Sequence, residues 1–182
     1  MRGRPPGSKI RENIALILNK LNVSYGYEIY KVYKQVFGKI LLRDIYYHLK
    51  KGQELGEFIA IETKVEPGNF TWGTQTERTY YTLGPFIQIK MDEKIEQRMS
   101  IFKEKEVNIN WENEINKIII SLNEEIESIT QKKMSYLAKK NVQDMLLKKI
   151  EKLKKWAENK ISKEKMMEIE ELKKKVLLMI LR

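Results

Sequence analysis

The spacing of apolar residues changes along the chain and separates two kinds of secondary structure. Apolar side chains first recur at intervals of three and four residues, which predicts three short amphipathic helices. We expect them at residues 9–21, 25–37 and 41–54. From Phe58 the apolar period shortens to two, and a second strand-like stretch spans residues 74–83. The sequence therefore predicts a β-hairpin after the third helix, with Pro67-Gly68 as its turn.

Three helices followed by a hairpin is the order of elements in a winged helix. In that fold the third helix enters a DNA major groove and the hairpin lies beside it. Other small α+β domains share this order, so the order alone does not identify the fold. Leu42, Ile45 and Leu49 have the spacing of an inward-facing stripe on the third helix. The opposite face of this helix is therefore expected to meet solvent or a partner.

The second half of the chain has a purely helical pattern. Residues 107–182 contain neither glycine nor proline, and apolar residues repeat there at three and four. We expect a short helix at 92–106 and longer helices at 111–134, 136–160 and 163–181. Each is apolar on one side only, so the helices must pack on one another or on a second subunit. The predicted contact residues of a coiled-coil-like dimerisation region are Trp111, Ile115, Ile118, Leu122, Ile126, Ile129, Leu146, Ile150, Leu153, Leu172, Val176 and Ile180.

These patterns divide the chain into four predicted parts. Residues 1–8 form a flexible basic arm, and residues 9–84 form a winged-helix DNA-binding domain. Residues 85–110 are a connector with a short helix, and residues 111–182 are a helical dimerisation or interaction region. The expected fold class is α+β in the N-terminal domain, followed by a long all-α region.

Composition and charge limit the kinds of partner and the kinds of catalytic or metal site that this chain can have. The 182 residues carry a net charge of +10 with a pI near 9.5, which favours a polyanionic partner. The chain has no cysteine and one histidine, which excludes disulfides, thiolate chemistry and histidine-based metal sites. No phosphate-binding loop or catalytic triad is found, so we expect neither an enzyme nor a cofactor. No signal peptide or membrane span is visible, and a cytoplasmic, nucleoid-associated protein is expected.

The outward face of the third predicted helix combines cations with a phenol. Arg43, Tyr47 and Lys50 recur at spacings of four and three, and Lys51 lies beside them. Arginine can bridge the O6 and N7 atoms of guanine, and lysine neutralises phosphates. An ordinary solvated helix face would carry the same residue types. The predicted DNA-binding residues in the helices and the wing are Lys39, Arg43, Tyr46, Tyr47, Lys50, Lys51, Lys64 and Arg78.

The expected hairpin tip carries two large aromatic residues, Phe70 and Trp72. Aromatic side chains beside a turn would be unusually exposed unless something covers them. They would pack either on DNA sugars or a partner, or back onto the core of their own domain. The sequence leaves both arrangements open.

Three segments resemble the PadR-like winged-helix transcription regulators. YGYEIYK at 25–31 is similar to the signature that opens the second helix of that family. IYYHLKKGQELGEFI at 45–59 is similar to its recognition helix and first wing strand, and ERTYYTLG at 77–84 to its second wing strand. The resemblance implies a DNA-binding domain, dimerisation through C-terminal helices, and a recognition-helix tyrosine at Tyr46. Gly52 and Glu57 depart from the family pattern, which usually has apolar residues at both positions, and the helical C-terminal half is longer than usual.

The chain begins with a short basic stretch that resembles the core of AT-hook peptides. The residues concerned are Arg2, Gly3, Arg4 and Pro5. Glycine allows the backbone to approach the floor of a minor groove, and proline keeps the chain extended. Narrow A·T-rich minor grooves attract arginine through their enhanced negative potential. The alternative is a basic tail that only adds charge.

Two functional hypotheses follow from the sequence. The first is a transcription regulator that acts as a homodimer on double-stranded DNA, with an A·T-rich site for the arm. Its third helix reads the major groove, and its arm and wing contact the minor groove. The second is an architectural DNA-binding protein of low sequence specificity. A third, weaker one is a protein-interaction module that has lost DNA binding. The sequence identifies no small-molecule effector.

Overall fold

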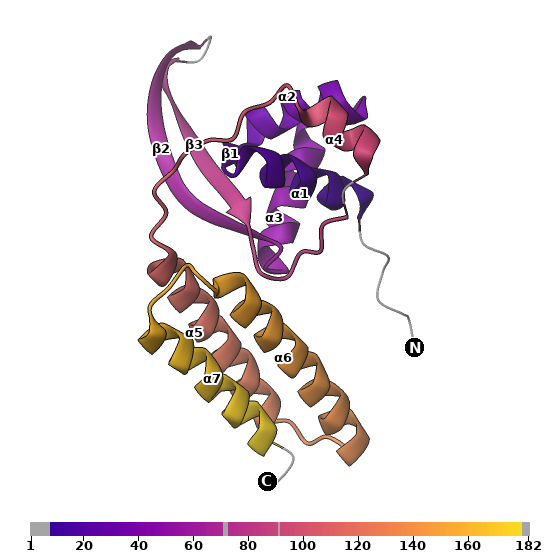
Figure 1. Cartoon of the computed structure of the whole chain (residues 1–182), viewed down its shortest axis with the longest axis vertical. Helices are drawn as coiled ribbons and strands as arrows, with labels where there is room; N and C mark the ends of the chain where they lie inside the picture. The colour runs from indigo at the N-terminus through magenta and orange to yellow at the C-terminus, as the bar shows by residue number, and fades with distance from the viewer. Residues whose placement is uncertain (1–7, 71–72, 91, 180–182) are drawn as a thin grey trace. The chain divides into compact units, whose positions relative to one another are not determined.

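The chain forms two compact units that meet between Asn108 and Ile109. The computed structural model describes residues 8–70, 73–90 and 92–179, and the side chains of residues 69 and 70 are not described. Within these residues the chain has seven α-helices and three β-strands (Figure 1). The first unit holds four of the helices and all three strands, and the second holds three helices.

Three helices build the core of the first unit, and their positions confirm the predicted helical pattern. They are α1 (Lys9–Leu21), α2 (Gly26–Phe37) and α3 (Leu42–Glu54). Their apolar stripes converge on one cluster in which Ile14, Ile17, Ile29, Ile45 and Leu49 have no exposed surface. Leu42 does not join this cluster as predicted, because it lies in the first turn of α3 and remains 36% exposed.

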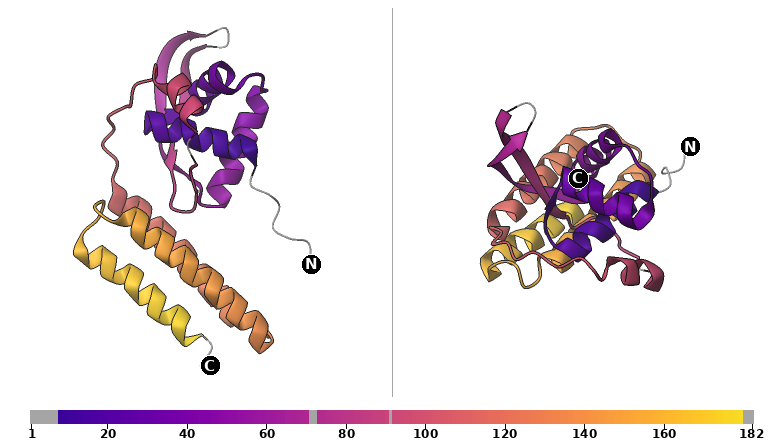
Figure 2. Two further views of the ribbon diagram at one scale, coloured as in Figure 1. Left: turned by 45° about the vertical axis from the view of Figure 1, so that its right-hand side comes forward. Right: turned by 90° about the horizontal axis from the view of Figure 1, so that it is seen from above.

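A three-stranded antiparallel sheet covers this core, as far as the described residues show. Its strands are β1 (Ser24–Tyr25), β2 (Phe58–Phe70) and β3 (Gly73–Leu83), in the order β1-β3-β2. The two-residue strand β1 pairs with β3 at Tyr80 and Tyr81, and the sequence pattern did not predict it. The β2–β3 hairpin extends past the helices as a curved ribbon (Figures 1 and 2). The predicted α+β architecture is thereby confirmed, and the order of elements is that of a winged helix.

The hairpin does not turn at Pro67-Gly68, so that prediction was wrong. Pro67 lies inside β2 and faces Gln75, and the register shifts between Pro67 and Phe70. Because β2 is an edge strand, a residue without a backbone N–H is tolerated there. The connection between β2 and β3 runs through residues 71–72, which lie outside the described residues.

The surroundings of Gly52 and Glu57 explain why these two positions do not carry apolar side chains. Gly52 is buried within α3, and a Cβ atom there would lie 2.1 Å from Cδ2 of Phe58. Glycine is therefore needed for the close approach of α3 to the aromatic ring. Glu57 is also buried, and its carboxylate accepts a hydrogen bond of 2.6 Å from Nε of Arg11. The acidic residue at this position is thus neutralised by α1.

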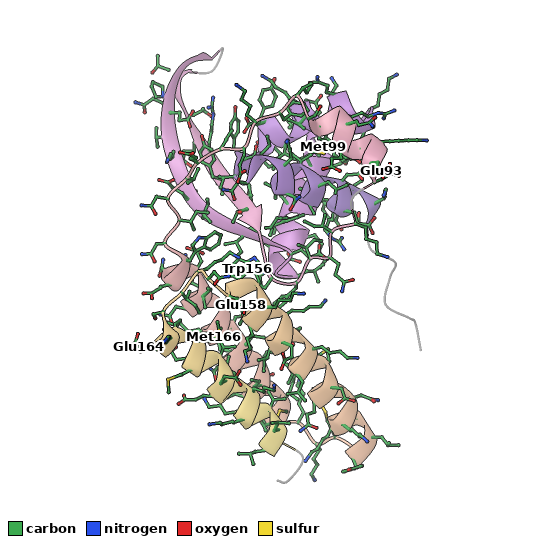
Figure 3. The ribbon with its side chains drawn as sticks, in the orientation of Figure 1. Glu93, Met99, Trp156, Glu158, Glu164 and Met166 are labelled. Atoms are coloured by element: carbon green, nitrogen blue, oxygen red, sulfur yellow. The ribbon has the colours of Figure 1, made fainter. Side chains whose placement is uncertain are left out.

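The chain after the sheet packs back onto the helical core of its own unit. Here α4 (Glu93–Met99) is shorter than the expected helix at 92–106. Met99, labelled in Figure 3, is 1% exposed and joins the core cluster. Farther along, the backbone N–H of Lys105 donates to the carbonyl of Leu21. This backbone bond holds the segment close to the end of α1.

The second unit is a bundle of three helices, each antiparallel to the one before it in the chain (Figures 1 and 2). They are α5 (Trp111–Thr130), α6 (Tyr136–Ala157) and α7 (Lys163–Leu178). The side chains of Asn110, Ser135 and Ser162 accept hydrogen bonds from backbone N–H groups in the first turns. Such N-caps explain why the helices begin where the apolar pattern begins.

Most predicted dimer contacts lie inside this single-chain bundle. The buried ones are Ile115, Leu122, Ile126, Leu146, Ile150, Leu153, Leu172 and Val176. Trp111, Ile118 and Ile129 are half-buried, Ile119 takes the fully inward position beside Ile118, and Ile180 lies outside the described residues. The apolar stripes thus form the core of the bundle within one chain, and their role in dimerisation stays a prediction.

The described residues contain no helix long and apolar enough to cross a membrane. Among the same residues, no group of three or more histidine, cysteine, aspartate or glutamate side chains could hold a metal ion.

Candidate nucleic-acid interface

The solvent-facing side of α3 carries the cations expected there. Ile45 and Leu49 point into the core, so the helical period turns Arg43, Tyr47 and Lys50 to the opposite side. All three are exposed, and Tyr47 is 64% exposed. Nε of Arg43 lies 3.7 Å from the carboxylate of the neighbouring Asp44, which is too far for a direct hydrogen bond. The charged atoms of this face are therefore exposed to solvent.

The other cations near α3 differ in whether a carboxylate of the chain neutralises them. Nζ of Lys51 donates to the carboxylate of Glu54 at 2.9 Å, and this hydrogen bond raises the pKa of Lys51. Lys39 is exposed in the connection between α2 and α3. Lys51 is thus partly neutralised within its own helix, whereas Lys39 adds positive charge beside the start of α3.

Tyr46 anchors α3 against α2. A Cβ atom at Gly26 would lie 2.4 Å from Cε1 of Tyr46, so only glycine allows the two helices to approach this closely. Burial, followed by the nearby Tyr25, raises the pKa of the Tyr46 hydroxyl, although the side chain is still 46% exposed. The tyrosine keeps its proton at neutral pH and can donate a hydrogen bond from the edge of the interface.

The two predicted wing cations are both paired with carboxylates. Nζ of Lys64 lies 2.9 Å from the carboxylate of Glu62 on the same strand. Arg78 pairs with Glu66 across the hairpin, and its guanidinium lies 4.5 Å from the ring centroid of Tyr25. Glu66 also accepts a hydrogen bond from Tyr80, and burial followed by this bond raises the pKa of Tyr80 to about 12. Arg78 is therefore part of a network that braces the hairpin against β1.

A groove of about 570 Å³ lies between the start of α2, the first turns of α3, and β3. The residues that line it are Tyr25, Gly26, Tyr27, Lys31, Leu42, Tyr46, Thr76, Glu77, Arg78, Thr79 and Tyr81. Nζ of Lys31 lies 4.8 Å from the ring centroid of Tyr27, one turn earlier on α2. Tyr27, Lys31 and Leu42 line this groove but were not among the DNA-binding residues predicted from the sequence. A signal was present in the glycine at the start of the second helix, which marks a close approach of another element.

The first described residue lies beside α3. Oγ of Ser8 is 3.5 Å from Nδ1 of His48. Arg2, Gly3, Arg4 and Pro5 lie outside the described residues. The same holds for Trp72 and for the side chain of Phe70, so both arrangements of the hairpin tip remain open.

Cations in the helical bundle are arranged differently from those on α3. Lys149 pairs with Glu125 at 2.7 Å, which joins α6 to α5. Lys173 of α7 pairs with Glu151 of α6 at 2.5 Å, and Lys154 pairs with Glu170. These pairs neutralise charge between helices of one chain, so this bundle surface is less suited to a polyanion than the face of α3.

No protein-family model and no curated protein matches the chain. Among solved structures, it is similar to the crystal structure of Bacillus subtilis PadR in complex with operator DNA. The sequence identity is 18% and the TM-score is 0.34, over 97% of this chain and 94% of that chain. Both values are too low to assign this chain to the family of that protein.

Proposed function

We propose that this chain is a transcription regulator that binds double-stranded DNA and inserts α3 into the major groove. The observation that carries the proposal is the outward face of α3, where Arg43, Tyr47 and Lys50 are exposed. A helix of this width fits the major groove, and arginine is the residue that most often reads guanine there. The formal charge of +10 supplies the long-range attraction to a polyanion.

The surrounding residues would position the helix on the DNA backbone. Lys39 before α3 and Lys31 on α2 would meet phosphates on either side of the groove, and Lys64 would meet them along the wing. Arg78 is held by Glu66 and Tyr25, so we assign it first to bracing the hairpin. The arm at Arg2 and Arg4 would reach an adjacent minor groove, because Ser8 lies beside α3.

The protein would act as a homodimer. One winged helix reads a short DNA segment, and two related by a twofold axis double the contacts on a palindromic site. Since the apolar stripes of the bundle are buried in one chain, a second copy would use exposed apolar side chains such as Leu137 and Met167. A footprint with twofold symmetry would support this arrangement.

The first test compares two charge-matched double variants. Arg43→Ala with Lys50→Ala removes two positive charges from the α3 face, and Lys140→Ala with Lys148→Ala removes two exposed ones from α6. Affinities for a DNA fragment are measured over a series of salt concentrations. We expect the α3 variant to lose at least about tenfold in affinity and the α6 variant to change little. Equal losses in both variants would refute the assignment of α3.

The second candidate function, an architectural DNA-binding protein, is favoured by the even distribution of charge. Residues 1–84 and residues 85–182 each carry a formal charge of +5, from 13 basic and 8 acidic residues in the first and 22 and 17 in the second. Such a protein would bind a promoter fragment and random DNA with similar affinity. A preference of a hundredfold or so for one fragment would instead support the regulator.

The contribution of the arm is tested separately. Arg2→Ala with Arg4→Ala should weaken binding mainly on sites that have A·T-rich flanks, because the arginines are proposed to enter a narrow minor groove. An unchanged affinity on such sites would mean that this stretch is only a basic tail.

A further inference from the structure

Two consecutive leucines are exposed at the point where α3 begins. Leu41 is 55% exposed and Leu42 is 36% exposed, whereas the preceding Ile40 packs against the core. In the run Ile40–Leu42, Ile40 therefore fixes the backbone to the core, and the side chains of Leu41 and Leu42 face solvent. These two side chains present apolar surface that a binding partner can cover.

The helix start also breaks a rule of local sequence preference. Leu41 is the N-cap of α3, with φ −90° and ψ 144°, and no side chain there accepts a hydrogen bond. Serine, threonine, aspartate or asparagine is preferred at this position, because an oxygen acceptor satisfies a free N–H of the first turn. A choice that lowers both solubility and helix stability points to a binding role for the side chain.

The surroundings of the leucines favour DNA as the partner. Lys39 precedes them, Arg43 follows them, and Leu42 lines the groove that also contains Lys31. Apolar side chains with cations nearby suit a polyanion that carries small apolar groups. In the major groove the C5-methyl group of thymine is such a group. Residues at the N-terminal end of a recognition helix are the ones that reach base edges.

We infer that Leu41 and Leu42 read the C5-methyl groups of thymine in the major groove, and thereby bias this protein toward A·T base pairs through direct contact. The inference rests on the proposed insertion of α3 into DNA. In this proposal the leucines contribute a preference for thymine. The cations contribute separately, by binding phosphates and guanine.

The test removes or adds the C5-methyl group of a pyrimidine and leaves every hydrogen-bonding group of the base unchanged. Binding of the full-length protein is measured to an alternating dA–dT duplex and to the same duplex built from dA and dU. A second pair compares alternating dG–dC with its 5-methylcytosine form, which places a methyl group at the same C5 position. We expect the methylated member of each pair to bind about fourfold more tightly for every methyl contact, as estimated from burying one methylene-sized group.

Three variants assign the effect to the leucines. Leu41→Ser supplies the missing N-cap, so the thermal unfolding midpoint should rise while the preference for methylated duplexes falls. Leu41→Ser with Leu42→Ala should bring the affinity ratio close to one. Leu55→Ser removes a leucine that is 40% exposed at the other end of α3, and the ratio should stay at the wild-type value.

The possible outcomes separate a failure of the inference about the leucines from a failure of the proposed DNA-binding function. Equal binding of the wild type to the dT and dU duplexes would overturn the inference and leave the proposed DNA-binding function intact. A preference that persists in the double leucine variant would also overturn it, because the discrimination would then arise from DNA shape or from other residues. A failure to bind any of the four duplexes at low salt would instead refute the proposed function itself.

Discussion

Replacing Gly52 with alanine should destabilise the first unit, although alanine is the better helix former. Gly52 lies in α3 with its Cα facing the ring of Phe58. An added Cβ would lie 2.1 Å from Cδ2 and 2.4 Å from Cε2 of that ring. Non-bonded carbon atoms prefer about 3.5–4.0 Å, so the ring or the helix would have to move by more than roughly 1 Å.

The magnitude follows from two opposing contributions. Alanine in place of glycine inside a helix favours folding by about 1 kcal/mol. Overpacking a core by one carbon atom costs about 1–3 kcal/mol, and the high end applies here because Phe58 is only 2% exposed and has little space to yield. We expect a net loss of about 1–2 kcal/mol in the free energy of unfolding.

Native-state hydrogen exchange measures this loss within the first unit alone. Ile45 and Leu49 of α3 have fully buried side chains, and their amides should exchange about five to thirty times faster in Gly52→Ala. In a Phe58→Leu background the ring edge is gone, so the same substitution should slow exchange instead, through helix propensity. If Gly52→Ala stabilises the protein in both backgrounds, the steric explanation is wrong.

Three further predictions concern polar contacts. Glu57→Gln should lower the free energy of unfolding by on the order of 3 kcal/mol, whereas Arg11→Met with Glu57→Leu should be nearly neutral, as measured by urea denaturation. Burial, followed by the charge of Arg11, lowers the pKa of His48, so the unfolded chain binds a proton more readily. Stability should therefore fall as the pH drops below 6.5, and His48→Gln should remove this dependence in thermal unfolding measured across that range. Gln143→Ala removes a donor whose Nε2 lies 2.9 Å from the carbonyl of Val176, and should cost about 1–2 kcal/mol by tryptophan fluorescence in urea. A zero loss in Glu57→Gln or in Gln143→Ala would contradict the roles assigned to these two side chains, and a pH dependence that persists in His48→Gln would contradict the role of His48.

Part of the candidate interface could be predicted because it depends only on the helical period. Once Ile45 and Leu49 are assigned inward, the same period places Arg43, Tyr47 and Lys50 outward. The prediction that Leu42 faces inward was wrong, because a stripe continues to the helix end only if neighbouring elements cover that end. The spacing of apolar residues along α3 does not indicate how much of this helix α1 and α2 cover.

The sequence by itself determined the approximate positions of α1, α2, α3, α5, α6 and α7 and the change from helix to hairpin. These features are local, since apolar spacing and N-cap residues act within a few positions along the chain. Only the tertiary structure decided which partner each side chain meets. It placed β1 beside β3, paired Arg78 with Glu66, and closed the apolar stripes of α5, α6 and α7 into one bundle. Such contacts join residues far apart in the chain, and a stripe of leucines or an exposed arginine is equally compatible with many partners until the fold brings one within reach.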